Sequence, residues 1–88
     1  MLWLLRPVNG LPQVRDARLN PWRPWYDKAF GFVVRAPDDA TARKLADAGA
    51  GDENRNDAHP WLDSQLSTCV PLTETGPTEV VLVDYRSA

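Results

Sequence analysis

Residues 29–49 read AFGFVVRAPDDATARKLADAG, and this stretch decides the fold because the spacing of its apolar residues changes partway along. In its first part Phe30, Phe32 and Val34 recur at every second position, which is the period of a strand with one buried face. Residues 29–36 are therefore predicted to form a strand whose aromatic face lies on the core.

A helix is predicted directly after this strand. Asp38 is a typical N-cap residue, and Gly49 is a typical residue at the C-terminal end of a helix. Between them, residues 39–48 carry a narrow apolar stripe of small side chains, which suits close packing on a sheet. The residues of this stripe are Ala42, Leu45 and Ala46.

The remaining apolar runs predict three more strands. Residues 2–6 form an apolar run that ends at a proline, as expected for a central strand. Residues 68–73 and 78–85 read as two strands, and the intervening residues 74–77 read as a turn. These two strands are therefore predicted to form a hairpin.

Together these elements define the fold class. Before the hairpin, residues 60–66 predict one helical turn, with Trp61 and either Leu62 or Leu66 directed inward. The chain is expected to be an α+β domain, in which one short helix packs on a mainly antiparallel sheet of about four strands, in the order β–loop–β–α–β–β. Its 88 residues suffice for one modest core, so we expect a single domain over 1–88.

A proline-rich segment over residues 7–26 includes most of NPWRPWYD, residues 20–27. The rings in this stretch either anchor the segment on the core or stack on single-stranded nucleic acid. We favour anchoring by Trp25 and Tyr26, because the chain has one cysteine and must rely on packing rather than on an internal disulfide. We expect Trp22 to be exposed and to serve as an aromatic contact. The basic residues that nucleic-acid binding would use are Arg15, Arg18, Arg23 and Lys28.

Metal binding and covalent catalysis have few candidate residues. One histidine and one cysteine cannot supply the ligand sets of zinc or iron–sulfur sites. Asp52, Glu53 and Asp57 lack the spacing of an EF-hand loop. Cys69 and His59 are the only pair for nucleophilic catalysis, and Cys69 lies in a predicted strand, where cysteine is usually inert. We therefore expect no metal, no cofactor and no enzymatic activity.

Charge is distributed unevenly along the chain. Residues 1–36 hold six basic and two acidic side chains, whereas residues 37–88 hold four basic and ten acidic ones. An acidic surface repels nucleic acid and attracts basic protein surfaces. A solvated acidic loop without a partner is the alternative interpretation. The residues predicted to form an acidic surface for a partner are Asp47, Asp52, Glu53, Asp57 and Asp63.

Several stretches resemble a family of small proteins of bacteria and their phages. The resemblance covers nearly the whole chain, and some of these proteins resemble phage anti-CRISPR inhibitors of type I surveillance complexes. The stretches are WLLRP at 3–7, PWYDKAFGFVVRA at 24–36, ARKLA at 42–46, GDE at 51–53, WLD at 61–63 and STC at 67–69. The resemblance implies a small non-enzymatic inhibitor and assigns no role to single residues.

A functional hypothesis combines this resemblance with the charge. The protein would bind a host protein complex through its basic DNA-binding surface, for example at the subunit that reads the protospacer-adjacent motif, and would act there as a DNA mimic. It would be a cytoplasmic monomer (in the host cytoplasm if phage-encoded), with no contact to membranes or directly to nucleic acid. The alternative is a small nucleic-acid-binding accessory protein that uses residues 15–28.

Overall fold

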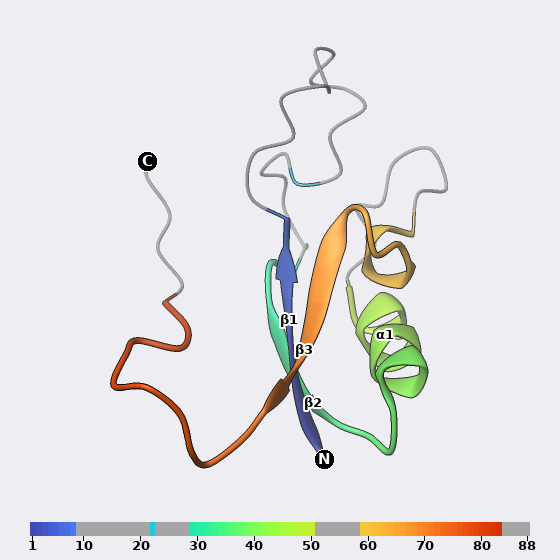
Figure 1. Cartoon of the computed structure of the whole chain (residues 1–88). Coiled ribbons are helices and arrows are strands. Elements are labelled where there is room, and N and C mark those ends of the chain that lie inside the picture. Colours follow the sequence, from blue (N-terminus) through green and yellow to red (C-terminus); the bar gives the residue numbers. More distant parts are fainter. Residues whose placement is uncertain (9–21, 23–28, 51–58, 84–88) are drawn as a thin grey trace.

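The structure is a computed structural model, and it describes residues 1–8, 22, 29–50 and 59–83. In this part of the chain, one α-helix packs on one face of a three-stranded antiparallel sheet (Figure 1). The elements in chain order are β1 (Leu2–Pro7), β2 (Phe32–Arg35), α1 (Asp39–Ala48), the 3-10 helix η3 (Pro60–Leu62) and β3 (Ser67–Leu72). The predicted α+β class is confirmed.

The strand β1 lies in the centre of the sheet, which has the order β2–β1–β3. Leu5 of β1 lies opposite Phe32 in β2 and opposite Cys69 in β3. Leu4 and Leu5 point to opposite faces, and both are buried. A strand covered on both faces has a continuous apolar run, so the N-terminal run correctly predicted a central position.

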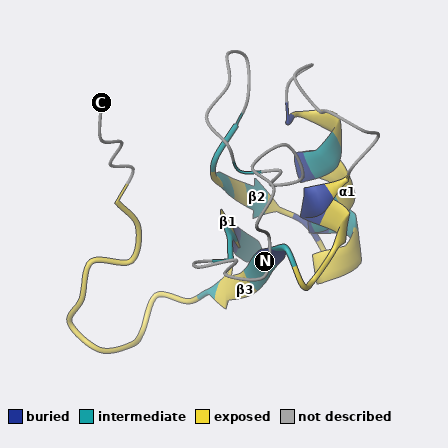
Figure 2. Cartoon of the chain, turned by 90° about the horizontal axis from the view of Figure 1, so that it is seen from above, coloured by how far each residue is buried: buried dark blue, intermediate teal, exposed yellow. Residues whose placement is uncertain are grey.

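The core lies between the sheet and α1. Its centre is Trp61, which is 1% exposed and makes edge-on ring contacts with Trp22 and Phe32, each with the ring centroids 4.9 Å apart. The face of α1 toward the sheet is buried (Figure 2), and its small side chains at Ala42 and Ala46 allow the close approach. Leu45 is 52% exposed, so the predicted apolar stripe is confirmed only at the two alanines.

The ends of α1 agree with the prediction from local sequence. The Asp38 side chain accepts a hydrogen bond from the backbone N–H of Thr41 at 2.7 Å, as an N-cap does. Gly49 ends the helix, and its N–H donates to the carbonyls of Leu45 and Ala46 at 3.1 Å. The φ of Gly49 is −98°, so the helix ends without a left-handed residue.

The predicted C-terminal hairpin is wrong over the residues that the structure describes. β3 pairs with β1, and residues 78–83 have no strand partner. Residues 73–83 instead leave the end of β3 and loop out on the side of the sheet opposite α1 (Figures 1 and 2). There, Nη1 of Arg6 donates a 3.2 Å hydrogen bond to the carbonyl of Val81.

The outer edge of β3 explains why no hairpin forms. In an antiparallel pair, successive residues direct their backbone N–H and C=O groups alternately toward and away from the partner strand. The bond from Val8 N to Leu66 O shows that the groups of Leu66 face β1. Those of Ser67 and Pro71 therefore face away from β1. Proline has no N–H to donate, and the amide and carbonyl of Ser67 are already bonded, the carbonyl to Arg43. Cys69, between them, is the one outward residue of β3 whose N–H and C=O are both unbonded within the described chain, so this edge offers little to a further strand.

Candidate acidic interaction surface

Two of the five predicted acidic residues lie in the described part of the chain. Asp47 is on the last turn of α1, and Asp63 directly follows η3. α1 and η3 pack against each other, so the two residues stand at the ends of neighbouring elements. The other three, Asp52, Glu53 and Asp57, lie outside the described residues.

Asp47 connects α1 to the start of η3. Its Oδ1 lies 3.0 Å from Nδ1 of His59, so the two side chains share a hydrogen bond, which becomes an ion pair when the imidazole is protonated. The His59 side chain is 57% exposed and that of Asp47 is 22% exposed. The sequence analysis considered His59 only as a possible catalytic partner of Cys69 and missed this contact.

Asp63 holds the turn between η3 and β3. Its Oδ1 accepts a 2.8 Å hydrogen bond from the backbone N–H of Gln65, and its carbonyl accepts bonds from the N–H groups of Leu66 and Ser67. The residue as a whole is exposed. Its carboxylate therefore faces solvent in a fixed orientation, since one oxygen is bonded to the turn.

Arg43 fixes η3 and β3 onto α1. Its Nη1 donates to the carbonyl of Trp61 at 3.0 Å and to Oγ of Ser67 at 2.8 Å, and its Nη2 donates to the carbonyl of Ser67 at 3.1 Å. Ser67 is completely buried, and its Oγ donates in turn to the carbonyl of Pro60 at 2.7 Å. Among the described residues, no carboxylate lies within ion-pair distance of Arg43.

This use of Arg43 has an electrostatic consequence. The Arg43 guanidinium points into the fold. Among the described residues of α1 and η3, Lys44 is therefore the only basic side chain that is exposed. The exposed acids of the same layer are Asp38, Asp39 and Asp63. Hydrogen bonds from Thr41 hold the pKa of Asp38 below its ordinary value, which favours its charged form. The described surface of this layer is therefore mainly acidic.

Trp22 lies on the core, so the expectation of an exposed ring is wrong. Its Nε1 donates a 2.9 Å hydrogen bond to the carbonyl of Leu66, and its ring packs on Trp61. A half-buried position satisfies both the apolar ring and its polar N–H. The other residues proposed for nucleic-acid binding lie outside the described residues: Arg15, Arg18, Arg23, Trp25, Tyr26 and Lys28.

Cys69 packs against the core from β3. Burial raises the pKa of its thiol, and the positive charge of Arg43 opposes this rise. A raised pKa leaves less thiolate, which is the reactive form, at neutral pH. Within residues 1–8, 22, 29–50 and 59–83, no three or more His, Cys, Asp and Glu side chains are grouped so that they could hold a metal ion.

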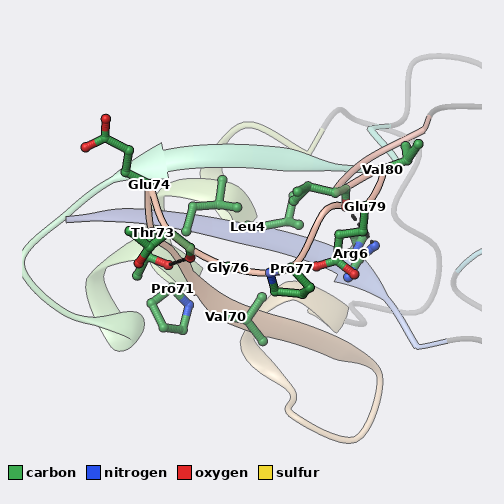
Figure 3. Close-up of a pocket in the computed structure, with 13 residues that line it drawn as sticks. Leu4, Arg6, Val70, Pro71, Thr73, Glu74, Gly76, Pro77, Glu79 and Val80 are labelled. Atoms are coloured by element: carbon green, nitrogen blue, oxygen red, sulfur yellow. Dashed lines mark hydrogen bonds between the residues drawn. The ribbon is translucent and has the colours of Figure 1, made fainter.

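A cavity of about 430 Å³ lies on the other side of the molecule, between the sheet and the C-terminal residues (Figure 3). Leu4 and Val70 of the sheet line it on one side, and residues 73–77 and 79–81 line it on the other. Leu4 is buried beneath this segment, whereas Val70 is 41% exposed. The second face of the sheet is thus apolar and incompletely covered.

No protein-family model, curated protein or solved structure matches this chain. Among the described residues, neither helix is long and apolar enough to cross a membrane.

Proposed function

We propose that the protein is a non-enzymatic inhibitor of the anti-CRISPR kind. It binds a host type I surveillance complex through an acidic surface made of Asp47, Asp52, Glu53, Asp57 and Asp63, and it blocks recognition of target DNA. The observation that supports this proposal best is the charge of the α1–η3 layer. Asp63 of the proposed surface is exposed there together with its neighbours Asp38 and Asp39 of the same layer, whereas the Arg43 guanidinium is directed inward and held by three hydrogen bonds.

Asp47 and Asp63, the first and last residues of the proposed acidic surface, are held in place by hydrogen bonds, which favours binding. Asp47 is bonded to His59, and the Asp63 side chain is bonded to the turn before β3. Asp47 belongs to α1 and Asp63 directly follows η3, and both of these elements pack on the core. Groups held in place before binding lose less conformational entropy on association, so more of the interaction free energy appears as affinity.

The chemistry of the partner follows from the charge. A surface that binds DNA presents lysine and arginine side chains to phosphates, and an acidic protein surface is attracted to the same groups. The subunit that reads the protospacer-adjacent motif has such a surface, and an inhibitor bound there would compete with DNA. Long-range attraction of this type chiefly raises the association rate, which salt then lowers.

The alternative, a nucleic-acid-binding accessory protein, is less well supported. Base stacking needs an exposed ring, and Trp22, the one ring of residues 15–28 in the described part of the chain, is bonded to Leu66 and packed on Trp61. The excess of acidic over basic side chains in the whole chain also opposes binding to phosphates.

The experiment is a binding assay with a purified type I surveillance complex and charge variants of the protein. The variant D52K/E53K/D57K should lower the association rate at least about tenfold at low salt, since charge complementarity acts mainly on this rate. The variant D47N/D63N removes two charges but keeps oxygen acceptors for His59 and for the turn, so it should weaken binding without unfolding the chain. Binding of both variants at the unmodified rate would disprove the acidic surface.

Two controls accompany this assay. E74K changes an exposed acid on the far side of the sheet from α1, so binding should be nearly unchanged. C69S tests the non-enzymatic part of the proposal, because inhibition should persist and should require one protein per complex. Loss of inhibition in folded C69S, or inhibition at far lower than equal amounts of protein, would instead point to catalysis.

A further inference from the structure

The run Val80–Val83 is an exposed apolar strand sequence without a strand partner. These four residues are 78%, 45%, 44% and 71% exposed in order. β-branched and other apolar side chains in such a run favour a strand. Among the described residues, their one hydrogen bond is that from Arg6 to the Val81 carbonyl, so their backbone N–H groups are unpaired.

The outer edge of β2 also lacks a strand partner among the described residues. Met1 and Ala36 are joined by the bond from Ala36 N to Met1 O, in register with the β1–β2 pair. Since antiparallel pairing alternates, Val33 and Arg35 direct their N–H and C=O groups away from β1. No backbone hydrogen bond is made by these outward groups within the described chain. The Val33 side chain is also 52% exposed.

The two edges of the sheet therefore differ in what they can accept. The outer edge of β3 is interrupted by Pro71 and by the bonds of Ser67, which leave Cys69 as its one outward residue with both backbone groups unbonded, whereas β2 contains no proline and both of its outward residues, Val33 and Arg35, are unbonded within the described chain. A free, proline-free edge is a template for pairing with another strand. The added strand would thus join β2 and make it an interior strand of the sheet.

We propose that a second copy of this chain supplies that strand, and that two copies exchange their C-terminal runs. Residues 79–83 of each copy pair antiparallel with β2 of the other. Glu79 then lies opposite Arg35, and Val81 lies opposite Val33. Each sheet acquires a fourth strand from its partner, which departs from the expectation of a monomer and does not depend on the proposed inhibitory function.

In this register the side chains also have suitable neighbours on the opposite strand. Glu79 and Arg35 are both exposed, and placing them opposite each other pairs unlike charges across the strands. The same register sets Val80 beside Val34 and Leu82 beside Phe32, on the face of the sheet that carries the core. A parallel arrangement would separate the two charges, so the antiparallel one is favoured.

The area involved is sufficient for a stable pair. Judged from their exposed fractions, Val80–Val83 expose roughly 400 Å² in one copy. If each run is fully covered by the other copy and covers a comparable area in return, a two-fold pair buries up to roughly 1,600 Å², which reaches the range of stable protein interfaces. Exchange also removes from solvent the apolar run that would otherwise promote aggregation.

The first experiment measures molar mass by sedimentation from micromolar to submillimolar concentrations. The chain is expected to be a dimer at the upper end. V81P removes the N–H that faces Val33, whereas V80P removes one that faces away from β2, so V81P should weaken the dimer at least about tenfold more than V80P does. A monomer at every concentration would overturn the proposal, and so would equal effects of the two proline variants.

The second experiment tests the register by exchanging charges. E79R and R35E each place like charges opposite each other at two positions of the symmetric dimer, and each should weaken it by about tenfold. The double variant E79R/R35E should recover most of that loss. Circular dichroism confirms that the exposed substitutions leave the fold intact. If the double variant is weaker than both single variants, the register is wrong and the proposed pairing fails.

Discussion

Replacement of Arg43 by methionine tests how η3 and the acidic surface are held. Methionine keeps the apolar stem of arginine but removes the guanidinium and its three hydrogen bonds, and it leaves the carbonyls of Trp61 and Ser67 without their partners. A buried polar group that loses its partner costs about 1–3 kcal/mol. Arg43 is half-buried, so water can replace part of the loss, and we expect R43M to lower the free energy of unfolding by about 2–4 kcal/mol.

A double-mutant cycle isolates the contact with Ser67. S67A removes the hydroxyl that accepts from Arg43 and donates to Pro60 in a fully buried position. Because one partner of the 2.8 Å bond is charged, the coupling between R43M and S67A should be about 1–2 kcal/mol.

The assay is denaturant unfolding, with the slope m checked for constancy across the variants. K44M is the matched control, since Lys44 is the exposed neighbour of Arg43, and it should change stability by less than about 0.5 kcal/mol. The reasoning is refuted if R43M costs no more than K44M, or if R43M and S67A are additive.

Three further predictions concern local contacts. In the folded chain the hydrogen bonds from Thr41 lower the pKa of Asp38, so its contribution to stability is present above the unfolded pKa, about 4, and is lost as the pH falls through the lower folded value. The melting temperature of D38A should therefore lie below that of the parent at neutral pH and approach it in acid, and a constant difference would contradict this. W22F replaces the indole with a smaller phenyl ring and removes the N–H that bonds to Leu66, so denaturant unfolding should show a loss of at least about 1 kcal/mol, and no loss would mean that neither the bond nor the ring contact is formed in solution. G49A should change stability by less than about 1 kcal/mol, because φ is −98° and an added Cβ would have no neighbour closer than 3.5 Å; a larger loss on unfolding would show that the helix end needs glycine.

Local signals in the sequence were sufficient for α1 and for the central strand. The limits of α1 follow from Asp38 and Gly49, which act within one turn of the helix. The position of β1 follows from its unbroken apolar run. Val80–Val83 have the same apolar character, yet pairing depends on which backbone edge is free. That edge is decided by the register of β1 with both neighbours and by Pro71, and neither is visible in the run itself.

The contacts around the site could not be predicted, because they join residues far apart in the sequence. Arg43 bonds to Ser67, which is 24 residues away, and Trp22 bonds to Leu66, which is 44 away. Counting charges treated Arg43 as a surface base, although its guanidinium points into the fold. Trp22 was expected to be exposed, but the buried ring of Trp61 provides an apolar surface for it.

Competition for DNA tests the proposed function most directly. Labelled target DNA is bound to a purified type I surveillance complex, and the protein is added up to equal amounts with the complex. We predict that the DNA is displaced at about one protein per complex, and that D52K/E53K/D57K displaces much less at the same salt concentration while E74K is unaffected. Undiminished DNA binding in the presence of excess folded protein would contradict the account.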